Sequence, residues 1–204
     1  QFVVSHLMPI RAKLVLVGQG FRFGHKGSGS IIELRQLGER FGFEAKEVPT
    51  VVFGDLPVSS TEIRKAIASG NIKAANAMLG RNHQTEGMVE HGRKIGRKIG
   101  FPTANLARNS EGLLPVDGVY AGWLHSDGVR YPAAHSVGTN DSIEAVPRLL
   151  ESHVIGRDDL DLYDKIVTCE YVEQVRPWAK YESMEKLIEQ IGSDVEACRR
   201  VLGE

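Results

Sequence analysis

Hydrophobic and polar residues alternate in two different ways along the chain, and the change falls near residue 80. Before that point, a continuous apolar run over 13–18 (KLVLVG) is followed by apolar residues at helical spacing over 30–41. Such a run is typical of a buried parallel strand, and the helical spacing is typical of an amphipathic helix. A second strand is expected over 44–52. This strand–helix–strand order predicts an open α/β sheet.

Two more helices are expected before the pattern changes. The segment 59–62 (SSTE) consists of residues that favour helix N-termini, and the helix that it opens ends at a glycine. A shorter helix over 71–79 ends at Gly80. We therefore place a domain boundary here, with a first domain over 1–80 and a second over 81–204.

After the boundary, the chain consists of short stretches in which polar and apolar residues alternate. These stretches span 85–90, 118–125, 129–137, 149–155 and 166–175. Asp127-Gly128, between two of them, is a hairpin signal. Short strands separated by turns predict a small antiparallel barrel or a sandwich. The last predicted element is an amphipathic helix that Ser183 caps and Gly203 ends.

The composition excludes several classes of protein. The 204 residues carry a net charge of -1 at pH 7, with 42% apolar and 25% charged residues, as in an ordinary globular protein. No apolar run approaches the roughly 20 residues of a membrane span, no signal peptide is visible, and no excess of positive charge indicates nucleic acid. A cytoplasmic protein with small-molecule partners is therefore expected, and a homo-oligomer is left open. Cys169 and Cys198 are expected to be reduced structural thiols.

The segment 91–105 (HGRKIGRKIGFPTAN) carries the most specific chemistry. Its three glycines let the backbone approach a ligand closely, and its four cations form a local anion site in a nearly neutral chain. Pro102 stiffens the approach to Thr103 and Asn105, whose side chains point the same way in an extended strand. Their hydroxyl and amide oxygens are hard ligands suited to Mg²⁺ or phosphate. For the basic residues alone, a solvated loop is the alternative.

This segment resembles the signature of the riboflavin kinase module of bacterial bifunctional riboflavin kinase/FAD synthetases. Similar motifs follow in the family's order at 114–121 (LPVDGVYA), 136–140 (SVGTN) and 151–155 (ESHVI). The resemblance covers essentially the whole chain from about residue 80 onward. It implies a six-stranded antiparallel β-barrel with a C-terminal helix, and the chain as a whole is then of the α+β class.

The resemblance also implies a reaction and a set of residues. Riboflavin kinases use Mg²⁺ and ATP to phosphorylate the ribityl 5'-hydroxyl of riboflavin, and they release FMN and ADP. Glu151 is implied to be the catalytic base and Arg199 to lie near the flavin, although Arg199 also suits the C-terminus of a helix. Thr103 and Asn105 are implied to hold Mg²⁺. The residues implied to bind ATP and its phosphates are Gly92, Lys94, Gly96, Arg97, Gly100, Pro102, Thr103, Asn105 and Asn140.

The first domain resembles part of the FMN adenylyltransferase module, a partial α/β nucleotidyltransferase-like (Rossmann-like) fold. Ser59, Ser60, Thr61 and Arg64 resemble a segment that helps to hold ATP phosphates at a helix N-terminus. The histidine–glycine–histidine loop of these enzymes is expected upstream of Gln1, so we interpret the chain as an N-terminally truncated copy. The four residues are then a vestigial nucleotide site, and FMN adenylyltransfer is not expected.

Two other functions stay open. The first is the complete bifunctional enzyme, if the missing segment is present in the parent protein. The second is a catalytically silent flavin- or nucleotide-binding module, which the unusual loop 141–147 supports. A nucleic-acid-binding role for the basic run 92–98 is weaker, because no aromatic residues alternate with its cations.

Overall fold

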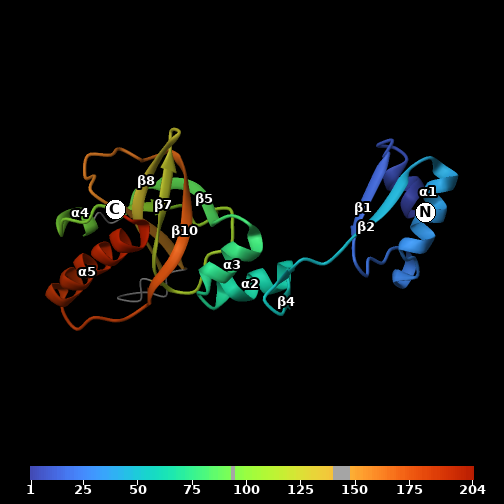
Figure 1. Ribbon diagram of the computed structural model, residues 1–204. Helices are drawn as coiled ribbons and strands as arrows, with labels where there is room; N and C mark the ends of the chain where they lie inside the picture. The colour runs from blue at the N-terminus through green and yellow to red at the C-terminus, as the bar shows by residue number, and fades with distance from the viewer. Residues whose placement is uncertain (93–94, 140–147) are drawn as a thin grey trace. The chain divides into compact units, whose positions relative to one another are not determined.

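The computed structural model describes residues 1–92, 95–139 and 148–204. It contains two compact units, Gln1–Val58 and Ser59–Glu204 (Figure 1). The division falls earlier than the boundary expected at residue 80, because the two helices that follow residue 59 pack on each other and the second of them packs on the barrel of the second unit. Among the described residues, no helix combines the length and the apolar character needed to cross a membrane.

The first unit is built around one strand–helix–strand motif. Strands β1 (Leu14–Gly18) and β2 (Glu44–Val48) form a two-stranded parallel sheet, and α1 (Ile31–Phe41) connects them. The expected order is confirmed, but β2 is shorter than predicted because Pro49 has no N–H to donate to a neighbouring strand. The unit also contains η1 (Val3–Leu7), η2 (His25–Gly27), β3 (Val52–Phe53) and β4 (Leu56–Pro57).

Local signals define both ends of α1. The side chain of Ser30 accepts a hydrogen bond at the helix N-terminus, and Glu33 accepts one of 2.9 Å from the Ser30 backbone N–H. Gly42, with φ of 81°, ends the helix in the left-handed conformation. Between these ends, Leu34 is fully buried and packs in one core cluster with Val17 of β1. Caps and one apolar stripe therefore fix this helix on its sheet.

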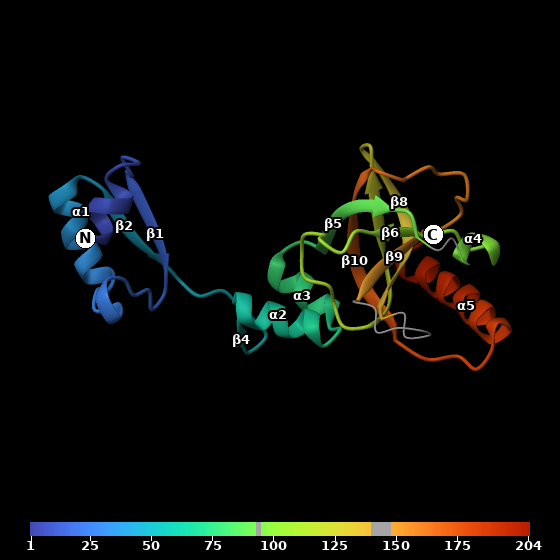
Figure 2. The ribbon, with the colours of Figure 1, turned by 180° about the vertical axis from the view of Figure 1, so that it is seen from behind.

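The second unit contains a closed six-stranded antiparallel barrel. Its strands are β5 (His83–Glu90), β6 (Ala104–Leu106), β7 (Gly118–Ser126), β8 (Val129–Gly138), β9 (Leu149–Val154) and β10 (Ile166–Pro177). Their order around the barrel is β10-β5-β6-β9-β8-β7, and every neighbouring pair is antiparallel. In Figure 2, β6 and β9 lie between β5 and β8. The structure is thus a barrel and not a sandwich.

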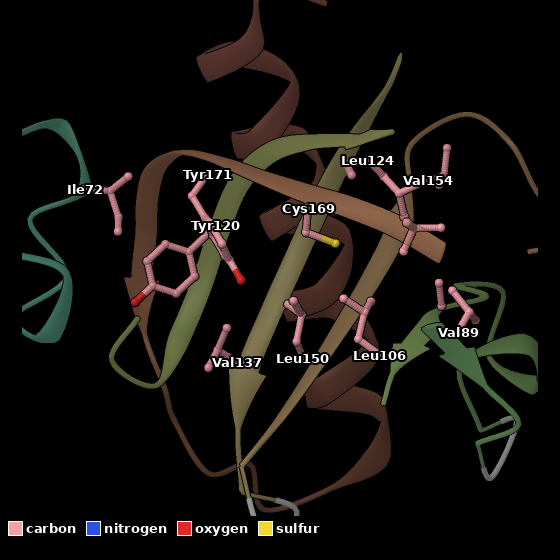
Figure 3. Packing of buried hydrophobic residues seen from close by; sticks show 13 residues of the cluster. Ile72, Val89, Leu106, Tyr120, Leu124, Val137, Leu150, Val154, Cys169 and Tyr171 are labelled. Carbon is pink, nitrogen blue, oxygen red and sulfur yellow. The ribbon is translucent and has the colours of Figure 1, made fainter. Parts of the chain in front are cut away.

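Alternation along the strands turns one set of side chains into the barrel, where they form a packed core (Figure 3). Tyr120 and Tyr171 are its largest fully buried members, and their ring centroids lie 5.6 Å apart in an edge-to-face arrangement. Burying a large apolar side chain stabilises a fold by roughly 1.5–3 kcal/mol. In the β7–β8 hairpin, Asp127 and Gly128 have φ values of 51° and 76°. These values match a two-residue turn that follows the twist of the strands.

Two short helices precede the barrel, and the second of them packs on β5 and β10. Helix α2 (Ser60–Ala68) begins at the predicted cap Ser59, and α3 (Ile72–Leu79) follows it. Ile72 is buried and joins the barrel core, and the Asn76 side chain donates a 2.9 Å hydrogen bond to the Tyr171 carbonyl of β10. These contacts join α3 to the second unit, and α2 belongs to the same unit because it packs on α3.

The C-terminal helix α5 (Met184–Leu202) packs against β7, β8 and β10 (Figure 1). Ser183 caps it and Gly203 ends it with φ of 74°, as predicted. Arg176 of β10 donates to both carboxylate oxygens of Asp194, which is only 5% exposed. Removing one partner of such a pair leaves a buried charge, which costs about 3–5 kcal/mol. This ion pair therefore fixes α5 on the barrel.

Both cysteines are structural. Cys169 of β10 and Cys198 of α5 are free and buried. Burial raises the pKa of both thiols to about 12. The thiolate is the reactive form of cysteine, so neither side chain is a nucleophile at neutral pH.

A buried histidine should make the stability of the barrel depend on pH. The ring of His135 lies inside the barrel, with Nδ1 2.9 Å from Ser152 Oγ and Nε2 3.2 Å from the Glu170 carbonyl oxygen. Burial lowers the pKa of His135 from 6.5 to about 4. Between these values the unfolded chain binds a proton at this ring and the folded barrel does not. The free energy of unfolding should therefore fall by about 2 kcal/mol between pH 7.5 and pH 5.

Urea unfolding at the two pH values, followed by tryptophan fluorescence, checks this prediction. The two tryptophans of the chain, Trp123 and Trp178, both belong to the second unit, so their signal reports on it. Burial also lowers the pKa of His83, which adds to the effect in the same direction. A His135→Gln variant should lose the larger part of the pH dependence. Equal wild-type stability at both pH values would contradict the prediction.

Candidate active site

Three of the predicted site residues meet on one outer face of the barrel. Strands β6 and β9 pair so that Asn105 lies opposite Glu151. Thr103 points the same way as Asn105, and its Oγ1 lies 3.5 Å from Glu151 Oε2, although the two residues are 48 positions apart. The alternating residues Ala104 and Ser152 are buried in the barrel. The pairing of these two strands therefore creates the cluster.

The surroundings of Glu151 alter its acidity. The side chain is half-buried, and burial raises the pKa of its carboxyl group. The hydrogen bond from the Thr103 hydroxyl opposes that shift. A carboxylate with a raised pKa holds a proton more tightly than an exposed one. Glu151 is thus better suited than a surface glutamate to accept a proton from a substrate.

Two adjoining hollows lie beside this cluster. The larger contains about 410 Å³ of space and the smaller about 270 Å³, part of it open to solvent. Arg97, Pro102, Thr103 and Tyr163 line both of them. Because Thr103 also contacts Glu151, it connects the hollows to the carboxylate.

The glycine-rich segment forms a turn at the smaller hollow. It contains a short helix, α4 (Ile95–Lys98), where only a loop was expected. Gly92 lies against the Asn105 side chain, and a Cβ atom on Gly92 would be 2.7 Å from Asn105 Nδ2. The Phe101 N–H donates a 2.8 Å hydrogen bond to the Gly96 carbonyl, and a Cβ atom on Gly96 would collide with the Phe101 carbonyl oxygen. Gly96 is therefore required by its contact with the backbone, whereas a side chain at Gly92 would displace the Asn105 side chain.

The structure brings most of the predicted phosphate-binding residues together. The smaller hollow is lined by Gly92, Arg97, Pro102, Thr103 and Asn105. Gly96 and Gly100 shape the turn itself, Gly100 through a left-handed φ of 88°. Lys94, Asn140 and the loop 141–147 lie outside the described residues.

Arg199 lies on α5, apart from the two hollows. Its Nε is 3.5 Å from Glu196 Oε1, and its guanidinium lies close to Gly156, just beyond β9. Burial lowers the pKa of His153, two residues beyond Glu151, and the charge of Arg199 lowers it further. Arg199 is therefore near the strand that carries Glu151, and its contact with the flavin stays a prediction.

The adenylyltransferase-like residues lie at the start of α2. Ser59 is the N-cap, and its side chain accepts a 3.2 Å hydrogen bond from the Glu62 N–H. Ser60, Thr61 and Arg64 are exposed on the first turns of the helix. The prediction of a capped helix is confirmed, whereas a nucleotide-binding role for these residues stays a prediction.

Sequence reasoning missed one wall of the larger hollow. The loop between β9 and β10 supplies five lining residues: Arg157, Asp158, Leu160, Leu162 and Tyr163. Of these, Tyr163 stacks on His91, at the start of the glycine-rich segment, with ring centroids 4.0 Å apart. The sequence signal that could have indicated this wall is the pair Leu160 and Leu162, which flank Asp161. Apolar side chains in a polar loop usually pack against other apolar side chains.

The fold and the site together define a class of protein. Its members are small six-stranded antiparallel barrels in which a glycine-rich basic turn lies beside a carboxylate on a strand, here Glu151 of β9. The family model described as riboflavin kinase matches residues 79–202, more than half of the chain. A second model, described as FAD synthetase, matches residues 1–62. The chain belongs to the riboflavin kinase family.

Relatives match both units. The bifunctional riboflavin kinase/FMN adenylyltransferase of Escherichia coli (strain K12) is 32% identical over 98% of this chain and 63% of its own length. The protein of the same name from Listeria monocytogenes is 32% identical over 97% of this chain and 63% of its own. A crystal structure described as a macrolide-efflux protein from Streptococcus pneumoniae has a TM-score of 0.85 at 31% identity, over 97% of this chain and 64% of that one. The chain thus spans 63% of the length of these curated relatives.

Proposed function

We propose that this chain is a riboflavin kinase, which transfers the γ-phosphoryl group of Mg-ATP to the ribityl 5'-hydroxyl of riboflavin and yields FMN and ADP. The observation that carries the proposal is the cluster of Thr103, Asn105 and Glu151 beside the hollows of the glycine-rich turn. Phosphoryl transfer needs positioning, neutralisation of charge and a group that accepts the hydroxyl proton. The cluster offers these within one pair of strands.

The smaller hollow suits the phosphates of ATP. Arg97 lines it with a guanidinium, a group whose donors match phosphate oxygens. Thr103 and Asn105 add neutral side-chain oxygens, which suit the Mg²⁺ that neutralises the phosphates. Mg²⁺ in such sites keeps several waters and few protein ligands. Thr103 and Asn105 therefore fit a metal that arrives with the phosphates of ATP.

The larger hollow suits the nucleoside. Leu160 and Leu162 give it an apolar surface for a flat base. Asp158 lines the same hollow and can accept hydrogen bonds from amino or hydroxyl groups. Because the hollow shares Thr103 with the smaller one, a nucleotide could extend through both with its last phosphate nearest to Glu151.

In the proposed reaction, Glu151 acts on the acceptor. The 5'-oxygen of riboflavin attacks the γ-phosphorus, and the bond from this phosphorus to the bridging oxygen breaks, so that ADP leaves. Glu151 accepts the proton of the hydroxyl and later releases it to solvent. Its raised pKa favours this role. A positioned base of this kind contributes roughly 10²- to 10⁴-fold to the rate.

Chromatography of a mixture of the protein, riboflavin, ATP and Mg²⁺ tests the proposal. A riboflavin kinase forms FMN and ADP in equal amounts. A silent flavin-binding module changes riboflavin fluorescence but releases no ADP. The complete bifunctional reaction would also convert added FMN and ATP into FAD.

A substitution at Gly92 should weaken binding of the nucleotide. In Gly92→Ala, the new methyl group meets the Asn105 amide at 2.7 Å, so the Asn105 side chain must shift by several tenths of an ångström. A displaced metal-binding or supporting group costs about tenfold or more in affinity. Calorimetric titration with Mg-ADP should therefore give a Kd raised by about tenfold.

Gly192→Ala is the matched control, because Gly192 lies in α5 and a Cβ atom there would have nothing within 4 Å. This change should leave the Kd of Mg-ADP unaltered and stabilise the helix by roughly 1 kcal/mol. Wild-type affinity in Gly92→Ala would show that Asn105 does not contact the nucleotide or its metal.

A further inference from the structure

The imidazole of His153 bonds to the turn that leads into the site. His153 lies two residues beyond Glu151 on β9, so both side chains project from the same face of the barrel. Its Nδ1 is 2.8 Å from the carbonyl oxygen of Pro102. Its ring meets the ring of Phe101 edge-on, with centroids 5.5 Å apart. One side chain of β9 thus contacts two consecutive residues of the glycine-rich turn.

The hydrogen-bond geometry fixes which nitrogen carries the proton. A carbonyl oxygen only accepts, so Nδ1 of His153 is the donor. Burial lowers the pKa of His153, the Pro102 carbonyl opposes the shift, and the charge of Arg199 on α5 lowers the pKa again. The ring is therefore neutral at physiological pH and keeps its Nδ1–H pointed at the turn.

We propose that His153 is a positioning residue that sets the orientation of the Pro102–Thr103 peptide and, through it, aims the Thr103 hydroxyl at Glu151 and the phosphates. The proline ring fixes φ of Pro102, so ψ is the one soft torsion that turns its carbonyl group. The hydrogen bond from His153 holds that carbonyl, and the next residue is Thr103, whose Oγ1 lies 3.5 Å from Glu151. The inference rests on the proposed kinase function.

The strand ladder does not fix this peptide. Paired positions between β6 and β9 are Ala104 with Ser152 and Asn105 with Glu151, so the ladder begins one residue after Thr103. The His153 side chain extends the attachment of the turn to β9 beyond the last paired backbone groups. The hydrogen bond from His153 Nδ1 to the Pro102 carbonyl thus continues the pairing of β6 and β9 by one position, with a ring nitrogen as the donor instead of a backbone amide.

Two substitutions separate the hydrogen bond from packing. His153→Phe keeps the ring and its contact with Phe101 but removes the donor. His153→Asn gives up the ring but keeps an N–H near the position of Nδ1. If His153 positions Thr103, His153→Phe should lower kcat for FMN formation by about 10- to 100-fold with the KM for riboflavin nearly unchanged, since a small misplacement of a reacting group has effects of that size. His153→Asn should stay within about threefold of the wild type, although its packing is poorer.

A near-normal kcat in His153→Phe would overturn the inference, and so would an equal loss in both variants, because packing alone would then explain the effect. Wild-type FMN formation in the same assay tests the kinase proposal separately. If the wild type forms no FMN, long-range ¹H–¹⁵N spectra of the imidazole and the amide shift of Thr103 decide the matter. A proton on Nδ1, and a Thr103 shift that changes in His153→Phe more than in His153→Asn, support the inference. A proton on Nε2 or an unmoved Thr103 amide overturns it.

Discussion

Replacing Glu151 with glutamine lowers kcat for FMN formation by roughly 10²- to 10⁴-fold, while riboflavin and Mg-ADP still bind with near-normal affinity. Glutamine keeps the size of the side chain and can hydrogen-bond to Thr103, but it cannot take a proton. Burial already disfavours the charged carboxylate at this position, so a neutral amide does not destabilise the barrel. Single-turnover formation of FMN, together with flavin fluorescence titration, separates the chemical step from binding.

The chain contains its own control for this substitution. Glu86 of β5 accepts a 2.9 Å hydrogen bond from Thr168 of β10, a second threonine–glutamate pair on paired strands. Glu86→Gln should leave kcat within about twofold of the wild type, because exposed pairs contribute little. If Glu151→Gln turned over as fast as Glu86→Gln, Glu151 would not be the base.

Replacing Thr103 with valine lowers kcat/KM for ATP by roughly 10²-fold, since one directed polar group is removed from the developing charge. Valine has nearly the same shape, so the strand and the hollow keep their form. The hydroxyl also lowers the pKa of Glu151. Without it the pKa rises further, and the base is protonated over a wider range. The acid limb of the pH–rate profile should therefore move to higher pH.

Thr168→Val removes the hydroxyl of the other pair and should change neither kcat/KM nor the acid limb. Measuring FMN formation between about pH 5 and pH 9 in both variants gives the comparison, with the limb read as the pKa of the essential base. A reduced rate with an unmoved limb would mean that Thr103 binds phosphate but does not influence Glu151. A normal rate in Thr103→Val would remove it from the site.

Local signals made much of the fold predictable. Caps such as Ser183 and terminators such as Gly80 and Gly203 act within one helical turn, so the sequence shows them directly. The choice between a barrel and a sandwich depends on pairing between distant strands, which periodicity does not encode. The boundary after Val58 likewise depends on which surface α2 and α3 cover.

The residues of the candidate site could be predicted where they belong to a sequence motif. The residues from Gly92 to Asn105 and the strand glutamate form recognisable patterns, and the structure brings their described members together. The lining residues Leu160 and Leu162 come from a loop whose path is set by contacts with the barrel. The His153 bond to Pro102 links residues 51 positions apart, and no local pattern indicates it.

The barrel is weakest at the three-residue strand β6, because few backbone positions pair there. Strand β6 joins β5 through two paired positions and β9 through two more, whereas β7 and β8 share nine. Such a short ladder opens more readily than the rest of the cylinder. A nucleotide that contacts Gly92, Thr103 and Asn105 would link the segment after β5 to β6 and stabilise the pairing at this position. Nucleotide binding and closure of the barrel at β6 are then linked equilibria. The nucleotide-bound protein is therefore more stable against unfolding than the free protein.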